Sequence, residues 1–448
     1  MNEESQTVKS QTSSRALTLS RRGMLSSALF GAGAIGLRAL ATGLPAAMLL
    51  DPFGKEALAA PVASKMLILL NSQSGDPIGC NVPGTYGPGK QDIVHPTDPA
   101  MAATTMKLGG QSVTAAKPWT TIPQEYLDRM CFFHHTTRTN GHSNHDKVLR
   151  LMGAVKRNEM SFSLYAKSLS KALGTIQAEP VGLGGVTVSF EGRTLSRVSP
   201  RGLSAVLAPV TSPLGSLQAL RDKEINRIYS LYKQHGTAEQ KQALDRYAIS
   251  RAQARQISTN LLDKLSGISN DNEAGQVVAA PVLAAMKVTP VITIKIAFGG
   301  DNHADPQLQK EADQQVAGVN YIKTLLQGLK DLNLQDEVIV ASLNVFGRNL
   351  QKKGLTGRDH NGLHHCAFMI GSTIRPGVVG SVSKQGNDWG ADAINSSTGV
   401  GGAGGDIKAE ESLASLGKTL GTALGVPDTE LNTNITEGKV VTSVIKTA

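Results

Sequence analysis

Short apolar runs that end in turn residues alternate along the chain with longer segments of helical periodicity. The runs that predict buried strands are residues 65–71, 130–136, 291–300 and 337–343, with shorter candidates at 366–371, 378–382 and 439–446. Helical spacing is seen over residues 144–155, 162–173, 307–332 and 413–424. Strands that alternate with helices predict an α/β fold, an α/β/α sandwich with a mainly parallel sheet.

Four other segments do not follow this alternation. Residues 84–118 are rich in Gly, Pro and Thr with little periodicity, and they predict an irregular excursion. Residues 181–192 alternate and carry glycines, which predicts a short strand pair. Residues 386–406 have low complexity and predict a mobile loop. The long polar helical pattern that begins near residue 213 predicts a helical insertion over about 213–288, within one domain of residues 62–448.

The first 59 residues have the pattern of a twin-arginine signal peptide. Arg21 and Arg22 stand in a Ser-Arg-Arg-Gly-Met-Leu motif, a weakly charged stretch follows, and Ala57-Leu58-Ala59 offers a cleavage site. We therefore expect export by the twin-arginine translocase to the periplasm or the outside, with no stable membrane span after processing. The alternatives are a retained N-terminal anchor or a chance arginine pair before an ordinary signal.

The charge of the chain narrows the choice of binding partners. The 448-residue chain carries a formal charge of +9, and removing the six basic and four acidic residues of the leader leaves 39 basic and 32 acidic residues, a charge of +7. These charges are interspersed, which argues against binding of nucleic acid and permits an anionic substrate.

The chain has three cysteines. Cys80, Cys131 and Cys366 allow one disulfide and a leftover thiol, but three buried free thiols is the favoured interpretation.

Aspartate and histidine residues gather just after several of the predicted strands. The chain holds ten histidines, and apart from His95 and His235 they fall into three groups. Because open α/β sheets place their chemistry at the carboxyl ends of strands, we expect these side chains to form one metal site assembled by folding. The candidate ligands are Asp76, His142, His145, Asp301, His303, Asp359 and His360, with His364 and His365 as candidates for a supporting role.

The candidates also have ordinary structural interpretations. Asp76 lies in a Ser-Gly-Asp-Pro sequence that is typical of a turn. His142 and His145 lie three positions apart at a helix start, a spacing that aims both imidazoles at one face. The alternative is that Ser143 or Asn144 caps this helix and the histidines are merely exposed.

The mixture of imidazole and carboxylate favours a divalent metal, zinc first, with manganese or calcium as other possibilities. Such an ion would polarise an ester oxygen or lower the pKa of a bound water to about 7. Arg348 follows a predicted strand and is placed to hold an oxyanion through a two-pronged contact, unless it is a surface arginine of a basic loop. The sequence has no G-x-S-x-G elbow and no phosphate-binding P-loop, so the attacking group stays open between Ser143 and a water on the ion.

Several of these motifs resemble a large bacterial family of twin-arginine-exported proteins of unknown function (domain of unknown function 1501), which is itself similar to the alkaline phosphatase and sulfatase superfamily. The matching motifs are Asp76 with Pro83, His145 at its helix start, Gly300-Asp301-Asn302-His303, Asn344-Val345-Phe346-Gly347-Arg348 and Gly357-Arg358-Asp359-His360. The C-terminal segment ASLGKTLGTALGVP also resembles the closing helix of the family. The resemblance covers most of residues 62–448.

The resemblance implies an alkaline phosphatase-like sandwich in which Asp76, Asp301, His303, Asp359 and His360 hold metal. The sequence departs from the family pattern at Val345, where the family usually has a glutamate. One carboxylate is therefore missing from the expected ligand set.

Two functional hypotheses follow. The first is an exported, metal-dependent hydrolase of small phosphate or sulfate esters, in which Arg348 binds the anionic group and Ser143 or an ion-held water attacks. The second is a non-catalytic envelope protein, a degenerate relative that keeps the fold to bind a partner or a glycan. The missing carboxylate at Val345 favours the second hypothesis.

Overall fold

The computed structural model describes residues 64–72, 74–175, 177–207 and 263–446, with a few positions between 223 and 237. The predicted signal peptide and most of the predicted helical insertion lie outside these residues. Among the helices that are described, none has the length and apolar character needed to cross a membrane.

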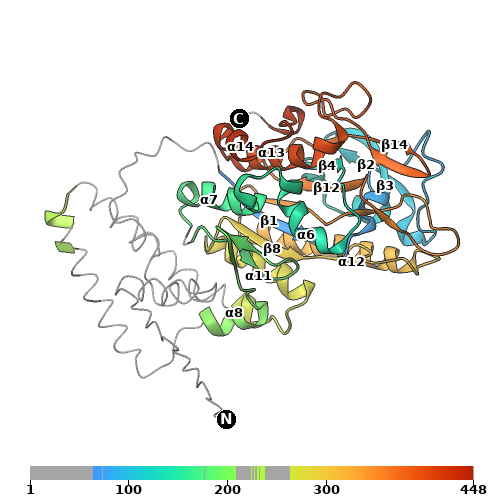
Figure 1. Ribbon diagram of the computed structural model, residues 1–448. Coiled ribbons are helices and arrows are strands. Elements are labelled where there is room, and N and C mark those ends of the chain that lie inside the picture. The colour runs from blue at the N-terminus through green and yellow to red at the C-terminus, as the bar shows by residue number, and fades with distance from the viewer. Residues whose placement is uncertain are drawn as a thin grey trace, which may run out of the picture.

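A seven-stranded sheet forms the centre of the described structure (Figure 1). Its strands, in spatial order, are β13 (Gly377–Val379), β4 (Met130–His135), β12 (His365–Ile370), β9 (Val338–Ser342), β1 (Met66–Asn71), β8 (Val291–Lys295) and β5 (Val181–Gly182). Four of the neighbouring pairs are parallel, and only β12 runs antiparallel to its two neighbours β4 and β9. The prediction of a mixed α/β fold with a mainly parallel sheet is confirmed.

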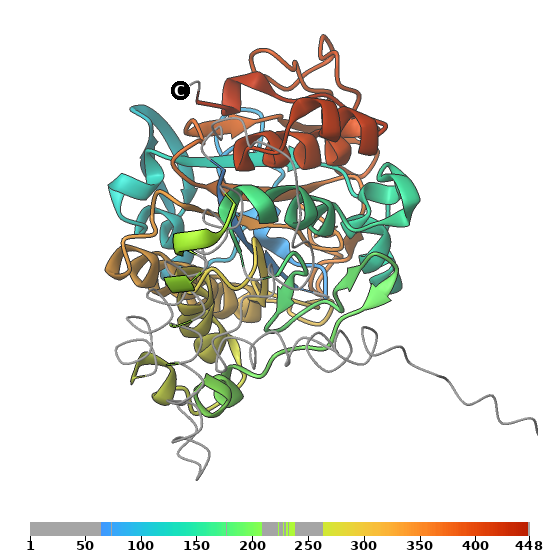
Figure 2. The same cartoon turned by 90° about the vertical axis from the view of Figure 1, so that its left-hand side faces the viewer.

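Helices cover both faces of this sheet. Successive side chains of β1 point to opposite faces, and all six of its residues are buried. Ile68 and its alternate neighbours pack with helices α11 (Glu273–Ala285) and α12 (Gln309–Asp331). Leu67 and Leu69 pack instead with helices α7 (Ser161–Leu173) and α13 (Ser412–Leu424). Figure 2 shows the α13 side and the α12 side on opposite sides of the strands.

An aromatic cluster fills the α12 side of the sheet. Trp119, from the short helix α4 (Lys117–Thr120), lies with its ring centroid 5.2 Å from Phe132, 6.2 Å from Phe298 and 5.8 Å from Phe368. All four side chains are almost completely buried. They tie the strands β4 and β12 to the segment that follows β8, which later carries Asp301.

The prediction of an irregular excursion over residues 84–118 is wrong in its second half. Strands β2 (Ala103–Leu108) and β3 (Gln111–Ala116) form a hairpin through Gly109 and Gly110. Both glycines have positive φ, of 55° and 89°, which a two-residue hairpin turn requires. The Gly-Gly pair between two Thr-, Ser- and Ala-containing runs was the available signal, but these runs carry too few large apolar residues to show a strand pattern.

Two predictions for the C-terminal part of the chain are also wrong. Instead of a closing strand over 439–446, the chain forms a short 3-10 turn, η7 (Thr442–Val444), and its pairing is an isolated bridge between Ile374 and Ile445. Within the predicted mobile loop, β15 (Asp388–Ala391) pairs with β14 (Val382–Gln385). Trp389 and Ile394 are buried there, so apolar anchors order a segment whose overall composition is that of a linker.

Two shorter segments differ in detail from their predictions. In the predicted strand pair of residues 181–192, β5 joins the main sheet, while β6 (Ser189–Phe190) pairs with β7 (Arg193–Thr194). The helix expected over 144–155 breaks after α6 (His145–Leu149), because Leu151 and Met152 have positive φ values of 51° and 57°. All three cysteines are buried free thiols, as the favoured interpretation predicts.

The remaining described elements are short or peripheral. They are η1 (Pro77–Cys80), η2 (Pro99–Met101), α5 (Gln124–Leu127), η3 (His142–Asn144), η4 (Leu151–Gly153), η5 (Lys156–Asn158), α8 (Pro200–Leu207), β10 (Gly347–Arg348), β11 (His360–Asn361), η6 (Ala409–Glu411) and α14 (Asp428–Asn434).

Replacing Phe368 by alanine should lower the free energy of unfolding by about 3–5 kcal/mol, because it leaves a cavity inside the aromatic cluster. Urea denaturation followed by tryptophan fluorescence measures this change, since Trp119 reports on the same cluster. Leu355→Ala is the control, because Leu355 is 93% exposed and its loss should cost less than about 0.5 kcal/mol. An effect of Phe368→Ala as small as that of the control would contradict this description of the core.

Candidate metal centre

Three chain segments that carry candidate residues follow strands that end at one edge of the sheet. Strands β8 and β9 are both parallel to β1, so their carboxyl ends lie at the same edge. Strand β4 shares their direction, because β12 is antiparallel to both β4 and β9. Asp301 follows β8, Arg348 follows β9 and His142 follows β4. The rule that predicted chemistry at the strand ends therefore explains how these distant residues come together.

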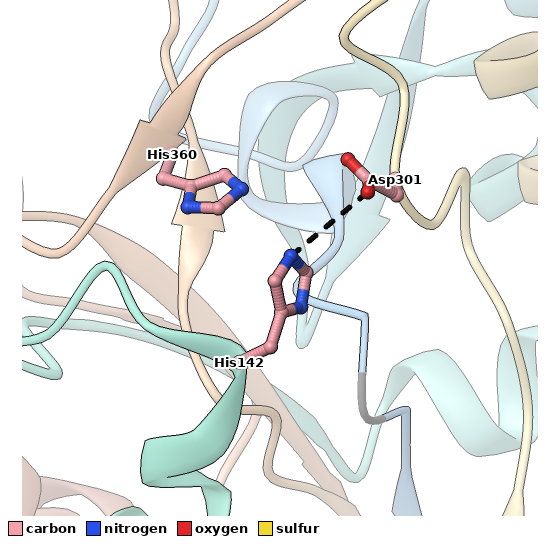
Figure 3. A group of neighbouring side chains, drawn as sticks. All are labelled: His142, Asp301 and His360. Carbon is pink, nitrogen blue, oxygen red and sulfur yellow. Dashed lines mark ion pairs between the residues drawn. The ribbon is translucent and has the colours of Figure 1, made fainter.

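His142, Asp301 and His360 form the centre of this edge (Figure 3). One potential ligand atom from each residue lies within 4.8 Å of the other two, and this is the metal-compatible group found among the described residues. His142 Nε2 lies 3.9 Å from Asp301 Oδ2. His142 and Asp301 are exposed and His360 is half-buried, so the group faces solvent.

His303 and Asp359 extend this group. His303 Nε2 lies 2.8 Å from His360 Nε2 and 3.2 Å from Asp301 Oδ1, and His303 Nδ1 lies 3.5 Å from Asp359 Oδ1. Two imidazole nitrogens at 2.8 Å share one proton, because one must donate and the other accept. The carboxylate of Asp359 favours a proton on Nδ1 of His303, the arrangement in which a carboxylate orients a metal-site histidine.

Arg348 holds Asp301 from the protein side. Its guanidinium NH2 donates to the carbonyl oxygen of Ser74 at 2.8 Å and lies 3.1 Å from Asp301 Oδ1. Burial alone would raise the pKa of Asp301, but the charges of Arg348 and His303 outweigh it and lower this pKa. The Arg348 side chain is fully buried, so in this structure it fixes a carboxylate instead of presenting an open fork to an oxyanion.

Asp76 lies apart from the exposed group, in a buried polar chain. Its carboxylate accepts a hydrogen bond from Asn344 Nδ2 at 2.6 Å and lies 3.5 Å from His365 Nε2. The other nitrogen of His365 lies 3.4 Å from His135 Nε2. The expectation that all acidic and imidazole candidates share a single cluster is thus met only in part, because the structure divides them into an exposed and a buried set.

The two histidines expected to share a helix face are separated. His142 belongs to the 3-10 turn η3 and points into the exposed group, whereas His145 begins α6 and is buried. Neither ring nitrogen of His145 has a hydrogen-bond partner within the described part of the chain. The two positions belong to different elements, since η3 ends at Asn144 and α6 begins at His145, so the spacing rule for a single helix does not apply to them. Ser143 is exposed on η3, beside His142.

Sequence reasoning missed the buried ion pair between Glu311 and Arg358. Arg358 Nε donates to Glu311 Oε2 at 2.7 Å, and NH2 donates to Oε1 at 3.0 Å. Both side chains are fully buried. In the sequence, Glu311 looks like an ordinary acidic residue in the first turn of a helix. The only available signal for a role of this pair was that Arg358 directly precedes the candidate ligand Asp359.

The comparisons with known proteins find similarity to one family model over part of the chain, and no function. Residues 191–398 match the model of a family described as protein of unknown function (DUF1501). The match contains Asp301, His303, Arg348, Asp359 and His360, while Asp76 and His142 lie before it. A search of curated proteins finds no match for the chain.

Buried histidines make the stability of this fold depend on pH in the acidic range. Burial lowers the pKa of His95, His134 and His145 to about 4, and it lowers the pKa of His135 and His364 well below 6.5. Between pH 6.5 and 4 these groups take up protons when the chain unfolds. Stability therefore falls as the pH drops through this interval.

Replacing His134 by glutamine should make the unfolding free energy less dependent on pH, by up to about 1.4 kcal/mol per pH unit between pH 6.5 and 4.5. His134 is fully buried, and its Nε2 donates to the carbonyl oxygen of Pro83, a bond that a glutamine amide can retain. Urea denaturation at several pH values measures the slope. The exposed His235 provides the control His235→Gln. Equal slopes for the His134 variant and the parent protein would contradict the assignment.

Proposed function

We propose that this protein is an exported, divalent-metal-dependent hydrolase of small phosphate or sulfate esters, with the ion held by His142, Asp301 and His360. The observation that carries the proposal is the approach of these three side chains to within 4.8 Å. They come from segments separated by more than 50 residues each, so local sequence does not account for their meeting. A mainly parallel sheet with helices on both faces is compatible with the phosphatase and sulfatase resemblance.

The residues present fit a divalent ion of the zinc type. Two imidazoles and one carboxylate are the donor set of catalytic zinc sites, which keep a further position open for water or substrate. The exposure of His142 and Asp301 leaves this position accessible from solvent. Manganese would also accept the set, whereas calcium prefers oxygen ligands alone. Bound there, the ion would supply Lewis-acid polarisation of the ester.

The chain's own residues would prepare the site for an anionic substrate. Arg348 keeps Asp301 ionised and fixed in place, and Asp359 orients His303 through its Nδ1. His303 then presents Nε2 beside the exposed group, 3.2 Å from Asp301 Oδ1, where it can hold or release a proton during ester cleavage.

Two lysines add positive charge at the rim of the site. Lys310 Nζ donates to the backbone oxygen of Asp301 at 2.8 Å, and Lys353 Nζ lies 3.5 Å from Asp359 Oδ2. Both residues are exposed, so their charges attract small anions from solution. The attacking group would be water or the exposed hydroxyl of Ser143.

A non-catalytic envelope protein that binds a partner or glycan is the second candidate. Val345, at the position where the resembling family usually has glutamate, is completely buried among apolar side chains. Arg348 is buried as well, so it does not reach a substrate in this structure. Both observations favour binding without ester cleavage, and the same experiment separates the two candidates.

Replacing Asp301 by asparagine should abolish stoichiometric zinc uptake and lower ester cleavage by about 100-fold or more, because it removes the anionic ligand. Elemental analysis of the purified protein measures the metal, and aryl phosphate and aryl sulfate measure cleavage. Asp406→Asn is a matched control, since Asp406 is exposed and pairs with Lys439 away from the site.

The possible outcomes distinguish the candidates. Zinc or manganese at one equivalent with cleavage of either ester, both lost only in the Asp301 variant, supports the hydrolase. Metal uptake without cleavage of either ester favours the binding protein. A well-folded parent protein that takes up neither metal contradicts the metal centre.

A further inference from the structure

The carboxylate of Glu311 is the centre of a buried hydrogen-bond network and accepts four hydrogen bonds. Besides the two bonds from Arg358, Glu311 accepts a hydrogen bond from Asn81 Nδ2 at 2.6 Å and from Asn302 Nδ2 at 2.9 Å. All four side chains are buried. Four donors to one carboxylate satisfy its hydrogen-bonding capacity, which is the condition under which a buried charge is tolerated.

Two of these donors stand next to the candidate ligands. Asn302 lies between Asp301 and His303, and Arg358 directly precedes Asp359 and His360. One carboxylate, on the first turn of α12, therefore contacts both segments that carry the exposed group. The third candidate ligand, His142, is linked to the segment of His360 through Asn140, two residues before it. His360 Nδ1 lies 2.5 Å from the carbonyl oxygen of Asn140.

Backbone contacts make the two segments adjoin at the same place. Gly357 N donates to the carbonyl oxygen of His303 at 2.9 Å, and Arg358 N donates to that of Asn302 at 3.1 Å. A Cβ atom at position 357 would lie 1.7 Å from the carbonyl oxygen of Asn302, so only glycine permits this approach. Arg358 also donates to the carbonyl oxygens of Asn349 and Leu350, which follow Arg348 in the chain.

We propose that Glu311 is a positioning residue for the metal centre: through Asn302 and Arg358 it sets the distance between Asp301 and His360. This inference rests on the proposed metal centre. A buried ion pair contributes little net stability compared with apolar residues of similar volume, which leaves its geometric role as the reason to retain it here. Glu311 touches neither the ion nor the substrate in this account, and it acts only by fixing the segments that do.

The test is the variant Glu311→Gln, assayed by calorimetric titration of the purified protein with Zn²⁺ alone. All four atoms that contact Glu311 are donors, so the amide NH2 of glutamine must face two of them in either orientation. The two ligating segments lose their common anchor, and zinc affinity should fall about 10–100-fold, the range for supporting residues of metal sites. The number of zinc ions bound should stay the same.

A second variant acts on one segment only. Asn302→Ala removes the link between Glu311 and the Asp301 segment and leaves the Arg358 pair intact. Asn302 Oδ1 has no partner among the described residues, so no other side-chain hydrogen bond is lost. Zinc affinity should fall about tenfold, the lower end of the same range. This variant keeps the test decisive if Glu311→Gln does not fold.

The control separates positioning from stability. Val319 is completely buried on the same helix, two turns beyond Glu311 or about 12 Å along its axis. Val319→Ala should lower the thermal midpoint of the metal-free protein and leave zinc affinity unchanged. If a folded Glu311 or Asn302 variant binds zinc within twofold of the parent protein, or if Val319→Ala weakens zinc binding equally, the positioning role is overturned. A parent protein that binds no zinc instead overturns the proposed metal centre itself.

Discussion

The arrangement of the candidate site depends on one buried ion pair, between Glu311 and Arg358. Removing two charges from water costs several kcal/mol for each ion unless hydrogen bonds replace the lost hydration. Here Glu311 accepts four hydrogen bonds and Arg358 donates to three backbone carbonyls as well. Every one of these partners belongs to a loop at the carboxyl edge of the sheet or to the start of α12. The pair thus holds several irregular loops in fixed positions relative to one another.

Two sets of histidines at this edge have opposite physical properties. The exposed set, centred on His142 and His360, keeps its ring nitrogens near a carboxylate and solvent. Two of the buried histidines, His134 and His364, are neutral because burial lowers the pKa of each. His134 Nδ1 lies 2.9 Å from His364 Nε2 across two adjacent strands. The same residue type therefore forms the exposed group that we propose holds a metal, and it makes hydrogen bonds in the core.

The sequence was informative about the central sheet and less so about its surroundings. Strands such as β1 and β9 were predictable because they are buried on both faces and therefore form continuous apolar runs. The β2–β3 hairpin lies at the surface with mixed polar and small residues, so its Gly-Gly turn was its only signal. Residues 439–446 misled in the opposite way: their apolar composition resembles a short strand, but the buried Val441 and Val444 lie three positions apart, at the two ends of the 3-10 turn η7.

The candidate site shows a similar limit. Strand-end reasoning correctly brought Asp301, His303, Asp359 and His360 to one edge, since parallel strands present their carboxyl ends together. It did not separate Asp76 from them, because which side chains are buried depends on loops far away in the sequence. It also gave Glu311 no role, since nothing local to a helix start shows that four donors from other segments converge on it.

The most direct measurement is the anomalous scattering at the zinc edge from crystals of the purified protein grown with Zn²⁺. We expect a single strong peak among His142, Asp301 and His360, about 2.0–2.2 Å from a ligand atom of each. A peak beside Asp76 and His365 instead, or no peak in this group at full zinc concentration, would contradict the proposed metal centre.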